Sequence, residues 1–146
     1  MKKLLIVLLV FSLLLVGCSV NFSVTNSNKS IANVEEVVDA LLMADREKVL
    51  NLMHTGVGIS QEDMQYGIDQ IIAVLGGKAK AKLEQKSFNV TTRVGTDPYK
   101  EERGEYLLTT TDGAVYAISY TYLENESDSG MAGFHVSQKK DPNPAS

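Results

Sequence analysis

The chain is poor in the residues that carry metal, redox and covalent chemistry. It has one cysteine and two histidines among 146 residues. A single cysteine cannot form a disulfide within the chain, so we expect the hydrophobic core to hold the fold together. The histidines, His54 and His135, lie far apart in the sequence, and no His-x-x-x-His motif is present. Zinc sites need closely spaced ligands, so the sequence predicts no metal and no other cofactor.

Positive charge is also scarce. The chain has 14 Lys+Arg against 18 Asp+Glu, for a formal net charge of −4. Proteins that bind nucleic acid gain affinity by neutralising phosphates with lysine and arginine. An acidic protein gains nothing from phosphates or from anionic lipid headgroups. A nucleic-acid partner is therefore disfavoured.

Only the amino terminus carries a long hydrophobic run. Met1-Lys2-Lys3 precedes residues 4–16, which are apolar apart from Ser12. A membrane-spanning helix needs about 20 apolar residues. This run has about 13, which fits the hydrophobic region of a secretory signal peptide. We interpret residues 1–17 as a signal peptide and not as a permanent transmembrane helix.

The run ends in Leu15-Val16-Gly17-Cys18. This motif resembles the bacterial lipobox, in which the cysteine thiol receives a diacylglyceryl group before the peptide is cut on its amino side. The resemblance implies that Cys18 is the lipidated mature amino terminus and that the protein is anchored to the outer, extracytoplasmic face of the cell membrane. Two acyl chains suffice for stable anchoring. The alternative is a buried or disulfide-bonded cysteine.

The remainder divides into three parts. Residues 18–30 hold the lipidated cysteine and an Asn/Ser-rich stretch that we interpret as a flexible tether, with a mean reach on the order of 20 Å. Residues 31–138 form the folded domain, a length that suffices for one ordinary domain. Residues 139–146 contain two prolines and no pattern, which is typical of a disordered tail.

Helical periodicity occupies the first half of the domain. Asn33 and Glu36 have the spacing of a capping box, and the apolar residues Val34, Val37, Val38, Leu41 and Leu42 follow on one helix face. Asp45 is expected to cap a second, short helix, and residues 54–58 are expected to form a loop. Ser60 is expected to open a third helix, which ends at Gly76-Gly77.

Alternation with period two occupies the second half. We expect strands from about Leu83, at residues 105–110, at residues 114–123 and at residues 131–137, with polar loops at residues 95–104 and 124–130. Asp112-Gly113 is a strong hairpin signal. The third of these strands is apolar on both faces, which favours a central position. We place Tyr116, Ile118, Tyr120 and Tyr122 on its inner face, opposite Leu41, Ile68 and Ile72.

Helices followed by antiparallel strands predict an α+β domain with its helices packed on one face of a curved sheet. The opening Ala40-Leu41-Leu42-Met43-Ala44-Asp45 through Leu52-Met53 resembles nuclear-transport-factor-2-like cone folds, which are cystatin-like rolls. With Leu75-Gly76-Gly77, Gly104-Glu105-Tyr106, Thr111-Asp112-Gly113 and Gly130-Met131-Ala132, the chain is similar to lipobox-bearing lipoproteins of Gram-positive bacteria that carry such a domain of unknown function. That family supplies no catalytic residues.

Cone folds often enclose a pocket between sheet and helices, and some relatives perform acid–base chemistry there. That chemistry needs a carboxylate or histidine base and a hydrogen-bond donor. The candidates are Asp45, Asp69, His54 and His135, together with the tyrosines Tyr66, Tyr116 and Tyr120, which we single out as candidate ligand-binding residues. Each has a plain structural interpretation: a helix cap for Asp45, a solvated position for Asp69, and core packing for strand tyrosines.

Two functions stay open. The first, which we prefer, is a non-catalytic binding or interaction module, tethered by lipid, with a small-molecule or protein partner that the sequence does not identify. The second is a small hydrolase or isomerase acting in the cone pocket. The acidic loop at residues 124–130 lacks the twelve-residue ligand spacing of a calcium loop, so a solvated hairpin is the simpler interpretation.

The lipobox predicts the fate of Cys18. In a Cys18→Ala variant the folded domain should stay intact, but no diacylglyceryl group can be attached, so lipoprotein signal peptidase should leave the precursor uncut. Metabolic labelling with a radioactive fatty acid measures this directly. Label that persists on the alanine variant would show that the lipid is not on Cys18.

Overall fold

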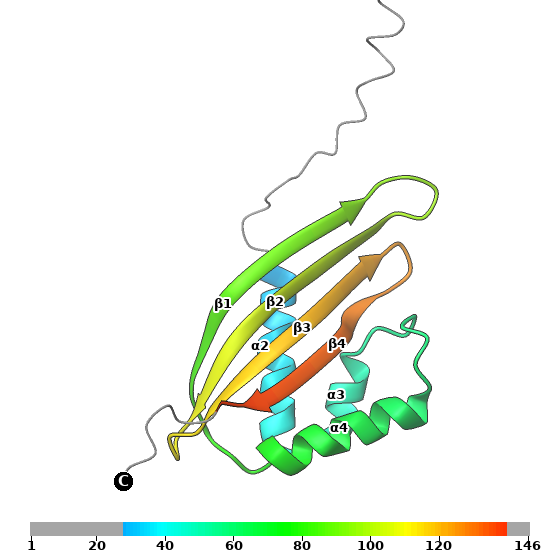
Figure 1. The fold of residues 1–146 in the computed structure, drawn as a ribbon. Coiled ribbons are helices and arrows are strands. Elements are labelled where there is room, and N and C mark those ends of the chain that lie inside the picture. The colour runs from blue at the N-terminus through cyan, green and yellow to red at the C-terminus, as the bar shows by residue number, and fades with distance from the viewer. Residues whose placement is uncertain (1–27, 140–146) are drawn as a thin grey trace, which may run out of the picture.

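Three helices precede a sheet of four strands in the computed structural model, which describes residues 28–139. The helices are α2 (Asn28–Leu42), α3 (Arg46–Asn51) and α4 (Gln61–Leu75), and the strands are β1 (Lys80–Arg93), β2 (Tyr99–Thr110), β3 (Val115–Asn125) and β4 (Ser129–Gln138). The strands pair antiparallel in chain order (Figure 1). The predicted α+β class is therefore confirmed. The expected signal peptide, Cys18 and most of the expected tether and tail lie outside the described residues.

Local side-chain chemistry sets the helix boundaries after α2. Asp45 caps α3, its carboxylate accepting a hydrogen bond from the backbone N–H of Lys48 at 3.0 Å. Ser60 caps α4 in the same way, accepting from the backbone N–H of Asp63 at 3.1 Å. Such caps satisfy N–H groups that have no partner inside the helix. Both predicted caps are confirmed, as is the end of α4 at Gly76.

The first helix begins earlier than the sequence predicts. Asn33 does not cap α2 but lies inside it, because the helix starts at Asn28. The last three residues assigned to the tether are therefore helical. Ser30 is fully buried in this first turn, which shows that the turn packs on the domain.

The sheet is also longer than expected. β1 starts at Lys80 and β2 at Tyr99, so the loop expected at residues 95–104 is wrong for its second half. Cross-strand pairing explains the difference, because Arg103 lies opposite Asn89 and Glu101 lies opposite Thr91 in a long β1–β2 hairpin. Arg103 also forms an ion pair with Glu101 at 2.6 Å. β2 also pairs with β3 along this stretch, so its charged residues are divided between the two faces of the sheet: Arg103 is exposed, whereas Glu102 is fully buried.

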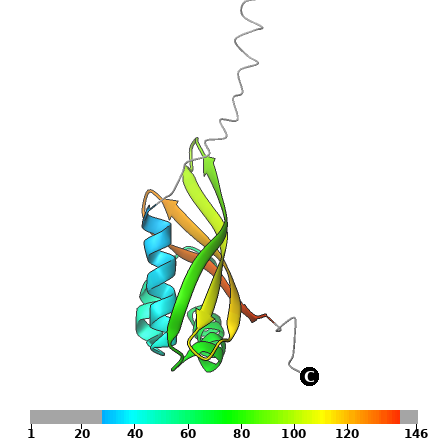
Figure 2. The same cartoon turned by 90° about the vertical axis from the view of Figure 1, so that its left-hand side faces the viewer.

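The core lies between the inner face of the sheet and α2, which covers that face (Figure 2). Tyr116, Ile118, Tyr120 and Tyr122 of β3 are all buried, as the alternation predicts. Leu41 and Ile68 are buried in the same cluster, and Ile72 packs against it. The turn at Asp112-Gly113 is confirmed by the positive φ of Gly113, 85°.

Burial on β3 predicts opposite outcomes for neighbouring substitutions. Ile118 is fully buried, whereas Ala117 on the other face is half-buried. Ile118→Ala should lower the free energy of unfolding by about 2–5 kcal/mol, and Ala117→Ser by about 0.5 kcal/mol. Chemical denaturation of the two variants measures both. A larger loss for the serine variant would mean that the two faces are assigned the wrong way round.

Candidate groove between α4 and β4

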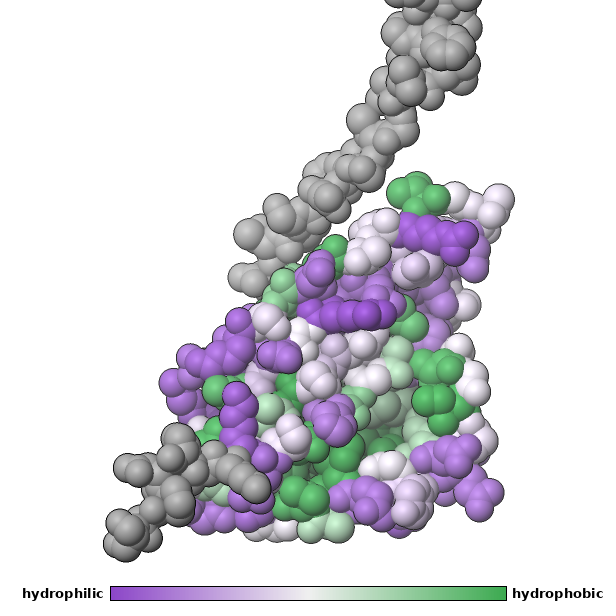
Figure 3. Space-filling model, in the orientation of Figure 1, coloured by the Kyte–Doolittle hydropathy of each residue, from purple (hydrophilic) through white to green (hydrophobic). Residues whose placement is uncertain are grey.

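An apolar groove of about 490 Å³ lies between α4 and β4. Its volume is within the range of about 300–1,000 Å³ that is typical of ligand sites. Hydrophobic residues gather around a hollow over these two elements in the lower half of Figure 3. The floor is made by core residues, among them Leu41, Val49 and Met131. The groove therefore opens directly onto the hydrophobic core.

One wall of the groove is a face of α4. Met64, Ile68, Ile71 and Val74 lie on this wall at helical spacing, and Gly67 lies among them. Because α4 packs mainly against α2 and α3, it stands off the sheet and leaves part of its apolar face uncovered. Val74 stays 46% exposed, and Ile59, just before the helix, stays 53% exposed.

The other wall is the outer edge of β4. Six consecutive residues, numbers 131–136, line the groove. Successive residues of a strand point to opposite faces, so a groove that touches all six follows the backbone edge of the strand. The walls of the groove are thus a helix face and a strand edge.

Few polar groups enter the groove. Among its lining residues, Asp63 is the only carboxylate, and Gln70 and His135 are the other polar side chains. Asp63 already takes part in the α4 cap, its Oδ2 accepting a hydrogen bond from Ser60 Oγ at 2.6 Å. No lysine or arginine lines the groove. The arrangement suits an apolar ligand with at most a small positive charge.

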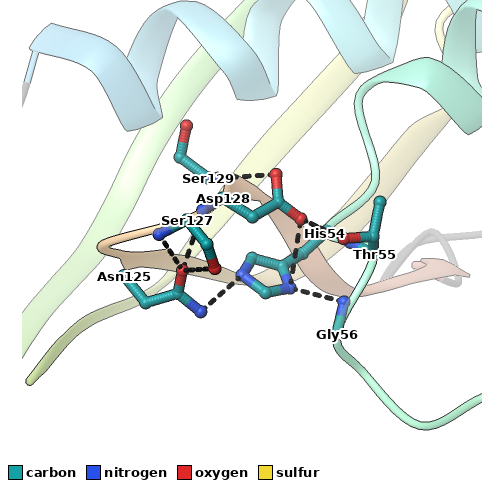
Figure 4. Close-up of polar contacts among 7 residues, drawn as sticks. All are labelled: His54, Thr55, Gly56, Asn125, Ser127, Asp128 and Ser129. Atoms are coloured by element: carbon teal, nitrogen blue, oxygen red, sulfur yellow. Dashed lines mark hydrogen bonds and ion pairs between the residues drawn. The ribbon is translucent and has the colours of Figure 1, made fainter. Parts of the chain in front are cut away.

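A polar cluster holds the loop after α3 against the turn between β3 and β4 (Figure 4). Asp128 accepts hydrogen bonds from the backbone N–H of Thr55 at 2.7 Å and from the Thr55 hydroxyl. The buried side chain of His54 accepts, at its Nδ1 atom, a hydrogen bond of 2.9 Å from the backbone N–H of Gly56. These contacts join the loop after α3 to the β3–β4 turn, so the cluster fixes the loop that carries Val57 and Ile59 into the groove lining.

The same loop pairs with the start of β4. His54 N–H donates to Met131 O at 2.9 Å, and Met131 N–H donates to Leu52 O at 2.9 Å. Gly130 makes this approach possible, because a Cβ there would lie 2.8 Å from His54 N and 2.9 Å from Met53 C. The loop is in effect a short parallel neighbour of β4.

The three tyrosines expected to bind ligand do not come together. Tyr66 is 66% exposed and lies outside the groove lining. Tyr116 and Tyr120 are buried on the inner face and are separated by about 13 Å of strand. Each has a polar neighbour, Lys78 for Tyr116 and Ser30 for Tyr120. The groove could not be found from the sequence pattern, because its β4 wall has no periodic arrangement of apolar residues. The apolar residues Ile59 and Val74, for which no place in the core was predicted, were the available signal.

The strongest candidate for acid–base chemistry is Glu102, which is 0% exposed beneath α2 and forms an ion pair with Lys100. Burial, with smaller contributions from Tyr106 and Glu102, raises the pKa of the nearby Tyr120 hydroxyl to about 12, against the lowering effect of a hydrogen bond with Ser30. Glu102 does not line the groove. Asp69, expected to be solvated, forms an exposed ion pair with Arg46 at 2.7 Å.

A second hollow of about 470 Å³ lies on the outer face of the sheet, and Tyr120, one of the tyrosines expected to bind ligand, is among its lining residues. Here Glu105, Ser119 and His135 occupy one cross-strand row. The serine stands between the carboxylate and the histidine, whereas a nucleophilic triad needs the histidine in the middle. The structure shows no hydrogen bond among these three described side chains. The row therefore lacks the geometry of an activated nucleophile.

Within residues 28–139, no three His, Cys, Asp or Glu side chains are grouped closely enough to hold a metal ion. The helices of this same region include none long and apolar enough to cross a membrane. Comparisons with protein-family models, characterised proteins and solved structures found no match to this chain.

The Asp128 contacts predict a pH-dependent stability. Hydrogen bonds from the Thr55 hydroxyl and backbone hold the pKa of Asp128 below its ordinary value. Their stabilisation is therefore complete above the pKa of an unfolded aspartate, about 3.9, and is lost as the pH falls through the lower folded-state pKa. The gap in free energy of unfolding between wild type and Asp128→Asn should be largest near neutral pH and should narrow at acid pH.

Denaturant titrations of both proteins between about pH 7 and pH 2 measure that gap. Glu126→Gln, an exposed carboxylate in the same turn, is the matched control and should change little. A gap that stays constant across this range would show that the charge of Asp128 does not stabilise the loop.

Proposed function

We propose that this protein is a lipid-anchored, non-catalytic binding module on the extracytoplasmic face of the cell membrane, and that the groove between α4 and β4 is its binding surface. The observation that carries the binding role is the groove itself. It exposes apolar side chains of a helix beside the backbone edge of a strand. Contiguous exposed apolar surface of this kind marks interaction or ligand-binding sites in soluble domains.

The composition of the groove supports binding over catalysis. A general base must reach its substrate and be free to accept a proton. The lining carboxylate, Asp63, is exposed and hydrogen-bonded in a helix cap. The lining histidine, His135, is exposed and belongs to the cross-strand row that lacks the geometry of an activated nucleophile. The lining holds no serine, threonine, cysteine or lysine. A ligand in this groove would meet mainly hydrocarbon.

The proposal also includes the lipid anchor at Cys18 and a specific fold type, the cone fold. The basic leader, the short apolar run and the motif ending in Cys18 support lipidation and outer-face location. A cone fold of the nuclear-transport-factor-2-like type is supported by the way the twisted sheet lies over α2 (Figures 1 and 2). An anchored domain of this shape would present its groove to molecules outside the cell membrane.

The alternative function, a small hydrolase or isomerase in the cone, is favoured by one observation, the buried carboxylate of Glu102 near the Tyr120 hydroxyl. Neither the groove nor the outer hollow includes Glu102 in its lining. A substrate would therefore have to displace α2 to reach it. The groove requires no such movement, which is why we prefer the binding role.

Filling the groove should weaken binding without harming the fold. Gly67 lines the groove, and a Cβ placed there would meet nothing within 4 Å. Gly67→Phe should therefore fit, and loss of a helical glycine favours α4 by up to about 1 kcal/mol. We expect a neutral apolar dye such as Nile red to bind the wild type and to bind this variant at least about tenfold more weakly, the loss expected when an apolar subsite worth about 1.4 kcal/mol is blocked.

The matched control is Ala73→Phe, which adds the same side chain to an exposed position of α4 outside the lining. It should bind the dye like the wild type. Gly67→Phe should melt no lower than the wild type, and Ala73→Phe should lose at most about 0.7 kcal/mol of stability, because phenylalanine has a lower helix propensity than alanine. Equal dye affinity for Gly67→Phe and wild type would rule out the groove as the apolar binding surface.

A further inference from the structure

We infer that the groove takes an extended peptide, neutral to cationic with apolar side chains at alternate positions, which adds to β4 as a fifth strand. This inference deepens the proposed function and rests on it. It concerns which class of ligand the groove recognises, and it follows from the hydrogen-bonding groups along the β4 edge.

The backbone of β4 points unpaired groups into the groove. Lys139 N–H donates to Val115 O at 2.8 Å, so these two residues form a hydrogen-bonded pair of the β3–β4 ladder. Such pairs alternate along an antiparallel ladder, and His135 opposite Ser119 is therefore another. The residues between them, Phe134 and Val136, must direct their N–H and C=O groups away from β3.

The outer edge of β4 already has a hydrogen-bonded neighbour near its beginning, at Met131. Met131, which also faces away from β3, exchanges two hydrogen bonds with the segment around Met53. Beyond that bridge, the described residues provide no neighbour for the outer edge of β4. Phe134 and Val136 come next along the strand, and both line the groove. A bound peptide would continue the pairing that Met53 begins.

The two edge strands of the sheet differ in how they are protected. β1 carries Lys80, Lys82, Glu84, Lys86 and Arg93 and has two register shifts. Charges and bulges of this kind prevent an edge strand from pairing with another chain. β4 has one register shift, between Met131 and Gly133 and so before Phe134 and Val136, but it has no charged residue and no proline over its whole length. Its edge is therefore left open to an added strand, and only this edge borders an apolar groove.

The edge groups also select the class of ligand. A fatty acyl chain could fill the hydrocarbon part of the groove but would leave the N–H and C=O groups of Phe134 and Val136 without partners, which is unfavourable where water is displaced. A peptide backbone supplies both donors and acceptors. Asp63 is the only lining carboxylate, and no lining residue is basic. Charge complementarity therefore favours a peptide with a positive group over an anionic one.

The test uses a fluorescent peptide of sequence Lys-Val-Thr-Val-Thr-Val and the full chain, with binding followed by fluorescence anisotropy. Val136→Pro removes the outward N–H without breaking a bond to β3, because proline is tolerated on a strand edge whose N–H faces solvent. We expect at least a tenfold loss of affinity for this variant. Val136→Ala, which keeps the N–H but shortens the side chain, should lose clearly less.

Two controls ensure that the test does not depend on whether Val136→Pro folds normally. Gln138→Pro also changes an outward-facing position of β4, but outside the groove lining, and should bind like the wild type. A peptide N-methylated at alternate amides keeps its side chains but cannot pair with a strand, and it should bind the wild type at least tenfold more weakly. Equal affinity for the methylated and unmethylated peptides would overturn strand addition.

The remaining outcomes separate this inference from the proposed function. If Nile red binds and Gly67→Phe weakens its binding but the peptide does not bind, the groove is an apolar binding surface and the inference of strand addition is wrong. If neither probe binds, both are wrong. If the free protein is a dimer in light scattering and Val136→Pro makes it a monomer, the occupant of the edge is a second copy and the peptide inference is overturned.

Discussion

The packing of a single helix across the inner face of the sheet governs the rest of the structure. Val34, Val37, Val38 and Leu41 of α2 are fully buried against the sheet core. The helix runs diagonally, since Lys29 at its start pairs with Glu124 at the end of β3 and Asp39 near its end pairs with Lys80 at the start of β1. A helix is about 10 Å wide, whereas four strands span about 14 Å between the outer strand axes. One diagonal helix therefore cannot cover both edges of this sheet along their full length.

The groove exists because α2 leaves part of the sheet uncovered. Where α2 reaches the start of β1, it has moved away from the second half of β4. That half of the sheet is left to α3 and α4, and α4 packs mainly on the other helices. The loop from Leu52 to Gly56 bridges the beginning of the gap, held by Asp128 and by the close approach at Gly130. Beyond it, the uncovered face of α4 and the uncharged edge of β4 remain opposite one another.

Local chemistry made much of the fold predictable from the sequence. The caps at Asp45 and Ser60, the turn at Asp112-Gly113 and the buried face of β3 each depend on a few neighbouring residues, and all four predictions are confirmed. The start of α2 and the first half of β2 could not be found in this way. Ser30 is buried only because the first turn of α2 packs on Tyr120, and Tyr99 to Gly104 pair as a strand only because β1 lies alongside.

The candidate site was less predictable than the fold, because it is built from parts that have no common sequence signal. The expected tyrosines fill the core or point into solvent, as Tyr120 and Tyr66 show. The groove instead combines a strand edge, whose chemistry is in its backbone, with a face of α4 for which the sequence predicted only core packing, as at Ile68. Two signals were nevertheless present: Ile59 and Val74 are apolar residues for which no place in the core was predicted, and β4 lacks the charged residues that β1 carries.

Backbone amide exchange along β4 tests most directly whether the groove is a binding surface with a strand edge as one wall. In the free protein, the amides of His135 and Ser137, which face β3, should exchange slowly, and those of Phe134 and Val136 should exchange fast. A saturating amount of the alternating peptide should slow Phe134 and Val136 by at least about tenfold, the factor that corresponds to 1.4 kcal/mol, and leave the amides of β1 unchanged. Protection that appears on β1, or no change at Phe134 and Val136 when the peptide is bound, would contradict the account.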